Sequence, residues 1–251
     1  MRVFAALLLL SLMAAAPVGA AEHSPAMLRL LVADSLPPPY LTRAGEGVEP
    51  EGLAIAMCRK VAARLGYGAT VRVAPPKRVP ELMRAGEADM LCHVAPEWYA
   101  YPDDLWFGRR LYSADNVFIA SKDAKPVCDD CPVPAEVATV IGYEYGDRVG
   151  QAFAGGASTR RDVRSEENVF RLVQHGRIDY GIVSEYTFHY FAGDRSDLSI
   201  KGYAARYHIT VAVPRNGPIS EAELMAASAA IRLPDDVAPE YRAFLGLPKQ
   251  K

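Results

Sequence analysis

The sequence has little of what nucleic-acid-binding, fibrous or membrane-spanning proteins display. Its net charge is −2 over 251 residues, and no basic region predicts binding to nucleic acid or to an anionic membrane surface. It contains no internal repeat and no low-complexity tract, which excludes solenoids and extended linkers. Beyond the N-terminus there is no apolar run long enough to cross a bilayer.

Catalytic and cofactor motifs are also missing. Ser184 has Glu185 and His189 nearby but lacks the Gly-x-Ser-x-Gly turn of a hydrolase nucleophile. His175 and His189 have no second histidine or cysteine at metal-ligand spacing, so we expect no metal. The glycine pair in 142–146 lacks the lysine of a phosphate-binding loop. We therefore expect a protein without a cofactor and without enzymatic activity.

Cysteine is scarce, with four residues in the whole chain. Cys128 and Cys131 lie three positions apart in a polar stretch followed by Pro132, which favours a local disulfide over a redox pair that opens a helix. Cys58 and Cys92 then pair with each other or remain buried thiols.

The N-terminus predicts export. An arginine at position 2 precedes an apolar run of residues 4–16, and small residues at 18–20 fit a signal-peptidase site after Ala20. We expect residues 1–20 to be a cleaved signal peptide, the alternative being an uncleaved anchor, and the mature chain to be a soluble periplasmic protein.

Hydrophobic patterning predicts an α/β fold. Strand-like segments alternate with helical ones, which implies mostly parallel sheets flanked by helices. The predicted strands are 28–33, 69–73, 89–94, 117–120, 139–142, 161–163, 180–183 and 210–213. The predicted helices are 53–65, 79–84, 147–153, 167–175, one beginning at the capping box of Ser220 and Glu223 and running to about 231, and a last one over 236–244.

These segments resemble the extracellular solute-binding proteins of family 3. The similarity lies in the order of several short motifs at 28–40, 51–66, 82–89, 97–112, 141–146, 175–180 and 207–214. The resemblance implies the two-lobed type II periplasmic-binding-protein fold, with lobe 1 at 22–118 plus 213–251 and lobe 2 at 119–212. It further implies a small-molecule ligand in the cleft and an ABC-importer permease as partner, and we expect a monomer.

Two departures from the family separate this chain from its amino-acid binders. Trp98 stands where the resemblance places the arginine that holds a substrate carboxylate, and Ser184 stands where it places the aspartate for the ammonium group. Arg109 and Arg110 follow about eleven residues later as a substitute clamp. We therefore predict that α-amino acids bind weakly.

The residues left at the predicted cleft are aromatic and acidic. Aromatic faces suit stacking and cation binding, and carboxylates suit ammonium or hydroxyl groups. For each aromatic the alternative is core packing, and for His93 it is a satisfied core histidine. The candidate ligand-binding residues are Tyr40, His93, Trp98, Tyr143, Glu144, Tyr145 and Glu185.

Two other functions remain open. A sensing module for a membrane receptor would use the same cleft. A dehydratase-like enzyme on the same fold would need Glu144 and Glu185 brought together for acid–base work.

Overall fold

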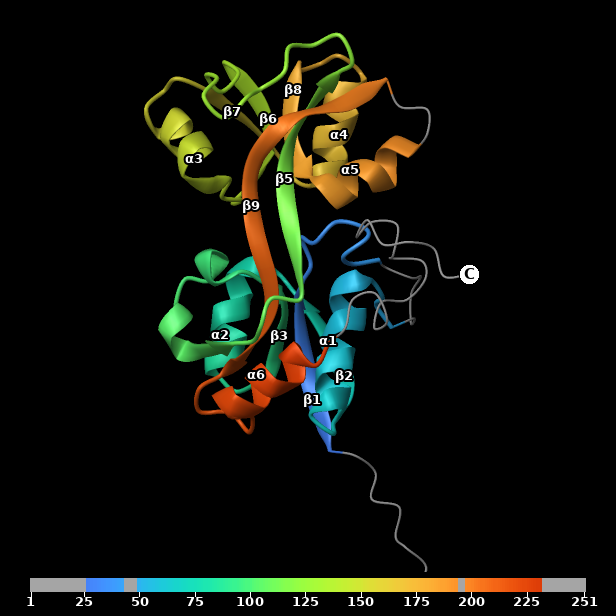
Figure 1. Ribbon diagram of the computed structural model, residues 1–251, viewed down its shortest axis with the longest axis vertical. Helices are drawn as coiled ribbons and strands as arrows, with labels where there is room; N and C mark the ends of the chain where they lie inside the picture. Colours follow the sequence, from blue (N-terminus) through green and yellow to red (C-terminus); the bar gives the residue numbers. More distant parts are fainter. Residues whose placement is uncertain (1–25, 43–48, 194–196, 232–251) are drawn as a thin grey trace, which may run out of the picture.

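The computed structural model describes residues 26–42, 49–193 and 197–231 (Figure 1). The strands are β1 (Met27–Ala33), β2 (Gly68–Ala74), β3 (Met90–Val94), β4 (Leu105–Phe107), β5 (Tyr112–Ser121), β6 (Glu136–Val140), β7 (Thr159–Val163), β8 (Tyr180–Ser184) and β9 (Leu198–Pro214). The α-helices are α1 (Leu53–Arg64), α2 (Val79–Arg84), α3 (Gly146–Ala154), α4 (Glu166–Gln174), α5 (Glu185–Ala192) and α6 (Glu221–Ala229).

The first lobe is a sheet with helices on both faces. Strands β2, β1 and β3 are parallel, and the end of β9 pairs antiparallel with β3. Because neighbouring strand residues point to opposite faces, Leu30 packs with α1 and α6 while Leu31 packs with α2. Both leucines are fully buried, so this sheet is covered on each side.

The second lobe repeats this plan. Strands β7, β6 and β8 are parallel, and β8 joins β5 in an antiparallel pair. Helices α4 and α5 cover one face, where Phe170 and Phe188 pack, and α3 covers the other through Val149.

Two long strands connect the lobes. β5 pairs antiparallel with β9 from Tyr112 opposite Ile209 to Ser121 opposite Leu198, and Figure 1 shows both strands running through the waist. β9 pairs with β3 around Thr210, and β5 pairs with β8 from Asn116 onward. β9 thus pairs with strands of both lobes, and β5 runs beside it.

The sequence located most of these elements but missed β4, α5, the first half of β5 and the part of β9 before Thr210. α5 is rich in aromatic residues, which are weak helix formers, and its start is marked only by Ser184 accepting a hydrogen bond from the Thr187 N–H. Gly202 and several half-exposed residues interrupt the apolar pattern of β9. The predicted signal peptide and the 236–244 helix lie outside the described residues.

All four cysteines form disulfides. The predicted bond between Cys128 and Cys131 is confirmed, with 4.9 Å between Cα atoms. Of the two alternatives for the other pair, Cys58 on α1 bonds Cys92 on β3, with 5.7 Å between Cα atoms.

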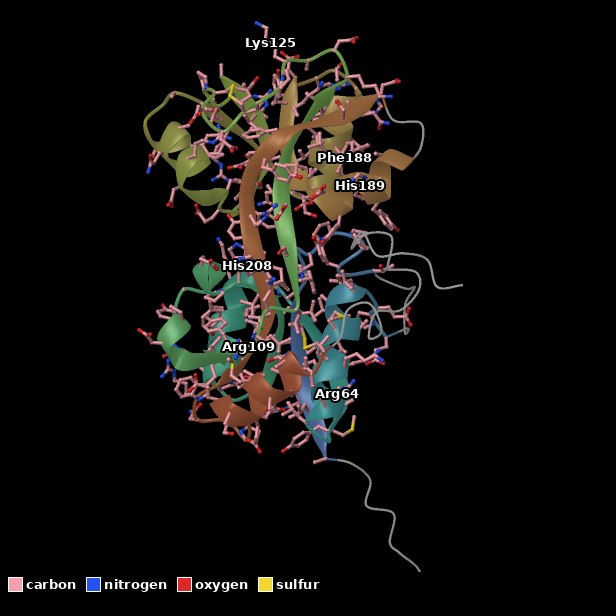
Figure 2. All side chains as sticks on the ribbon, in the orientation of Figure 1. Arg64, Arg109, Lys125, Phe188, His189 and His208 are labelled. Carbon is pink, nitrogen blue, oxygen red and sulfur yellow. A yellow bond between two sulfur atoms is a disulfide. The ribbon has the colours of Figure 1, made fainter. Side chains whose placement is uncertain are left out.

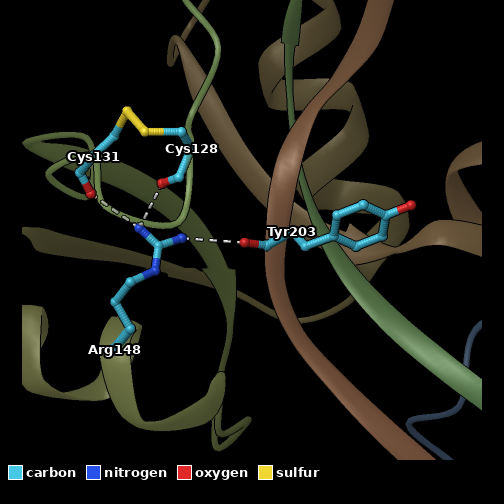
Figure 3. Close-up of a disulfide and its surroundings, with 4 residues drawn as sticks. All are labelled: Cys128, Cys131, Arg148 and Tyr203. Atoms are coloured by element: carbon cyan, nitrogen blue, oxygen red, sulfur yellow. Dashed lines mark hydrogen bonds between the residues drawn. A yellow bond between two sulfur atoms is a disulfide. The ribbon is translucent and has the colours of Figure 1, made fainter.

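The short disulfide loop is fastened to two elements of the second lobe. Figure 3 shows that the Arg148 guanidinium on α3 donates to the carbonyls of Cys128 and Cys131, and to that of Tyr203 on β9.

In the described part of the chain no helix is long and apolar enough to cross a membrane.

The capping box of α6 gives a first prediction. The Ser220 hydroxyl accepts from the Glu223 N–H at 3.3 Å, and the Glu223 carboxylate accepts from the Ser220 N–H at 2.9 Å. Ser220→Ala should therefore lower the free energy of unfolding by about 1 kcal/mol in urea denaturation. Ser220→Asp preserves the cap acceptor and serves as the control, and equal losses in both variants would contradict a capping role.

Candidate functional site

The lobes meet through polar contacts of the loop after β1. The Tyr143 hydroxyl donates to the carbonyl of Ser35 at 2.9 Å, and the Thr187 hydroxyl donates to that of Pro38 at 3.1 Å. The Ser184 hydroxyl donates to the Tyr40 hydroxyl at 3.2 Å. Residues after β6 and at the start of α5 thus hold the first-lobe loop against the second lobe.

An aromatic cluster lies at this junction. The Tyr40 ring centroid is 4.3 Å from that of His93, 6.4 Å from Tyr112 and 6.0 Å from Tyr186. Trp98 extends the cluster from His93 to Tyr207. We call the following six side chains the interlobe ring cluster: Tyr40, His93, Trp98, Tyr112, Tyr186 and Tyr207.

Trp98 is the accessible member of the cluster. Its ring lies 5.9 Å from that of His93 and meets Tyr207 edge-on at 4.8 Å. Trp98 is 38% exposed, whereas Tyr40 and Tyr207 are buried. The open side of the indole is thus available for stacking by a small molecule.

Burial keeps the centre of the cluster uncharged. It lowers the pKa of His93 to about 3, so the imidazole is neutral, and its Nδ1 lies 2.7 Å from the Tyr112 hydroxyl. Burial likewise raises the pKa of Tyr40 and of Tyr112. A neutral, hydrogen-bonded histidine beside Tyr40 fits both the packing and the cleft interpretation of His93.

A buried carboxyl group lies beneath the contact between the lobes. Glu166 at the start of α4 is 4% exposed and accepts from the Ser184 N–H at 2.8 Å. Burial raises the pKa of Glu166 to about 7, although the hydrogen bonds from Ser184 and Thr187 oppose the shift. Among the described residues no cluster of histidine, cysteine, aspartate or glutamate fits a metal ion.

Charged groups lie on the connecting strands. Arg206 on β9 donates three hydrogen bonds to Asp115 on β5: its Nε reaches both carboxylate oxygens at 3.0 Å, and its Nη2 reaches Oδ2 at 2.8 Å. Nearby on α5, the Glu185 carboxylate lies 3.9 Å from the His189 imidazole. Figure 2 shows His208 at the waist and Arg109 below it, in the first lobe, where its N–H donates to Ser228 of α6.

The sequence matches no family model and no curated protein, but many solved structures are similar. The B. pertussis BvgS periplasmic domain has a TM-score of 0.69 at 20% identity, covering 88% of this chain and 42% of that one. An ancestral amino acid-binding protein, a precursor of cyclohexadienyl dehydratase, has 0.66 at 15%, covering 87% and 95%. Arginine-bound ArgBP from T. maritima has 0.64 at 16%, covering 82% and 96%.

This chain has the type II periplasmic-binding-protein fold. The result confirms the predicted fold class, and the similar structures belong to the kind of protein that the sequence motifs resemble. Since all three identities are below 25%, the likeness concerns the fold.

Three of the seven candidate residues meet at the centre of this fold. Tyr40, His93 and Trp98 belong to the interlobe ring cluster. They meet because the loops after β1 and β3 leave the same edge of a parallel sheet.

The other four candidates lie around it. Tyr143 bonds the first-lobe loop, and Glu185 begins α5 beside Tyr186. The Glu144 side chain is exposed, while its carbonyl accepts from the Tyr207 hydroxyl at 3.0 Å. Tyr145 is buried in the second lobe, where its hydroxyl accepts from the Val140 N–H.

Sequence reasoning missed four residues of the junction. Tyr112 and Tyr207 lie on β5 and β9, where the pairing brings two distant segments together. Tyr186 lies on the unpredicted α5. Glu166 follows the N-cap Ser165, and since an acidic residue there is ordinary in a helix, its position gave no signal of a buried acid.

Proposed function

We propose that this protein is an exported solute-binding protein that holds a small molecule between its lobes. The observation that carries the proposal is the interlobe ring cluster, which takes side chains from both lobes and from both connecting strands. We propose the division predicted above, 22–118 plus 213–251 and 119–212, with bending of β5 and β9 at the waist to open and close the cleft.

The ligand is proposed to be aromatic, hydroxylated or cationic. Trp98 offers an accessible ring, and the Glu185 carboxylate lies beside Tyr186 of the cluster. Ser184 is already engaged with Tyr40 and Thr187, so it offers no charge for an ammonium group. Tyr40, His93, Trp98 and Glu185 are the proposed contacts, with Tyr143 and Glu144 forming the second-lobe border and the buried Tyr145 packing behind Tyr143.

Transport and sensing are the two candidate roles. We favour a periplasmic monomer that delivers its ligand to an ABC-type permease. Sensing is the second candidate, because similar structures include the BvgS periplasmic domain and the GluR0 ligand-binding core from Nostoc punctiforme. A permease and an ATPase encoded beside this chain would favour transport, and a kinase or cyclase would favour sensing.

A ligand screen tests the proposal. We expect thermal-shift screening of the mature protein to find a non-amino-acid ligand, and calorimetry to show that Trp98→Ala weakens its binding about tenfold to a hundredfold. The loss follows from removing the one well-exposed ring of the cluster. Trp106→Ala is the matched control because Trp106 lies on β4, covered by Arg215.

Two results would argue against this function. A low-micromolar affinity for a common α-amino acid would contradict the ligand class. Equal losses of ligand affinity in the Trp98→Ala and Trp106→Ala variants would contradict the proposal that Trp98 stacks on the ligand. Turnover of a bound hydroxy acid by elimination would instead support the dehydratase-like alternative.

A further inference from the structure

A cavity lies on the first lobe, on the α2 side of its sheet. It has a volume of about 360 Å³, and its walls come from α2, the segment between β3 and β4, and the end of β9. The residues that line it are Met83, Arg84, Tyr99, Asp103, Asp104, Leu105, Pro214, Arg215 and Asn216. None of them belongs to the interlobe ring cluster, so this cavity is separate from that cluster.

The Tyr99 hydroxyl lacks a hydrogen-bond partner. Tyr99 is 7% exposed, with its ring packed among the residues under α2. Within the described ranges, its hydroxyl is the one buried side-chain polar atom that no other group satisfies. A buried hydroxyl without a partner is costly, and this hydroxyl belongs to a residue that lines the cavity.

The charged groups around Tyr99 are fixed in place. The Arg84 guanidinium lies 3.5 Å from the Tyr101 ring centroid and donates to Asp104 at 2.6 Å. The Arg215 guanidinium lies 3.7 Å from the Trp106 ring centroid and donates to the Leu105 carbonyl at 3.3 Å. Stacking and hydrogen bonding orient both cations before any ligand arrives, which lowers the entropic cost of binding.

The balance of charges indicates the class of ligand. Two arginines and two aspartates line the cavity, together with one amide and one hydroxyl. A charged ligand would be attracted by the two side chains of opposite charge and repelled equally by the two of like charge. A ligand rich in hydroxyl groups fits better, since each hydroxyl donates to a carboxylate and accepts from a guanidinium.

We propose that this cavity is a second binding site, for an uncharged polyhydroxylated molecule of monosaccharide size. The Tyr99 hydroxyl bonds the ligand at the floor. Asp103 and Asn216 bond it at the rim, and Arg84, Asp104 and Arg215 form the wall. The volume is in the range of small-molecule sites.

The chain has two tryptophans, which gives a specific reporter. In a Trp98→Phe background, Trp106 is the remaining tryptophan, and it stacks on a wall residue of the cavity. We expect D-glucose to change its emission in a saturable way. Tyr99→Phe should weaken this binding at least tenfold, whereas Tyr101→Phe, which alters an exposed tyrosine beside Arg84, should leave it unchanged.

Stability gives an independent measurement. Without sugar, Tyr99→Phe should raise the Tm by about 2–4 °C, because it removes a buried hydroxyl that has no partner. With D-glucose, the Tm of the parent protein should rise and that of Tyr99→Phe should not. A lower Tm for Tyr99→Phe without sugar, or equal glucose binding in both proteins, would overturn the proposal. Because Trp98 is absent from the reporter, failure here leaves the cleft proposal untouched.

Discussion

Replacing Cys58 and Cys92 together by alanine should lower the free energy of unfolding by about 4 kcal/mol, and the same change at Cys128 and Cys131 by about 2 kcal/mol. The first disulfide joins residues 34 apart in the sequence and the second joins residues 3 apart. A longer closed loop removes more conformational entropy from the unfolded chain, so its loss costs more.

Burial should increase the difference in stability loss between the two double variants. Cys58 and Cys92 are almost fully buried, so their alanine variants also lose packing in the first-lobe core. The loop of Cys128 is on the surface and keeps its contacts with Arg148 through backbone carbonyls. Urea denaturation of both double variants provides the measurement, and unfolding under reducing conditions controls for residual bridges. Equal losses would contradict the loop-length argument.

The first disulfide also bears on the candidate site. Cys92 directly precedes His93, and the bond fastens this part of β3 to α1, whose start packs against the loop of Tyr40. Its loss should therefore loosen two members of the interlobe ring cluster.

The sequence predicted the α/β class because helical and strand patterns alternate, and the resemblance of several short motifs to a known family implied the two lobes. It also predicted the local features. Ser220 and Glu223 carry their capping signal within four residues, and Cys128 reaches Cys131 within the same span. The pairing of Cys58 with Cys92 stayed open because it depends on how closely α1 packs on β3, which local patterns do not contain.

The site was only partly predictable for a similar reason. Tyr40 and Trp98 follow strands of one parallel sheet and His93 lies near the end of one of them, so topology brings the three together. Tyr112 and Tyr207 meet the cluster through the register of β5 with β9, in which Tyr207 lies opposite Ala114. The paired residues are almost a hundred positions apart in the sequence, and the composition of neither strand indicates which residues pair.

Glu166 and His93, the two buried titratable groups at the junction, should have opposite effects on the pH dependence of the free energy of unfolding, so that the two effects cancel. Burial raises the pKa of Glu166 to about 7 from an ordinary 4.5, so its contribution to stability is lost as the pH rises from about 4.5 to 7. Burial lowers the pKa of His93 to about 3 from 6.5, so its contribution is lost as the pH falls from about 6.5. Between pH 4.5 and 6.5 the two slopes are opposite and nearly equal.

We therefore expect the wild-type free energy of unfolding to be nearly flat from pH 4.5 to 6.5, and each single variant to reveal the slope of the other group. Glu166→Gln should gain about 2 kcal/mol as the pH rises through this window, and His93→Gln should lose about 2 kcal/mol. The Glu166→Gln side chain keeps an acceptor for the Ser184 N–H, and the His93→Gln side chain keeps a polar group for the Tyr112 hydroxyl.

The other shifted acids do not disturb the window. Hydrogen bonds from Arg29 lower the pKa of Asp89, the one from Arg72 lowers the pKa of Glu87, and those from Ser220 lower the pKa of Glu223, so all three act below pH 4.5. Tyr40, Tyr143 and Tyr145 face Glu166 and remain neutral because burial raises the pKa of each. Urea denaturation at four pH values between 4.5 and 6.5 makes the comparison, with the Glu166→Gln/His93→Gln double variant as the control that should be flat again. A flat profile for Glu166→Gln would mean that the His93 imidazole is solvated, and a flat profile for His93→Gln would mean the same of the Glu166 carboxyl; either result would contradict the closed contact between the lobes.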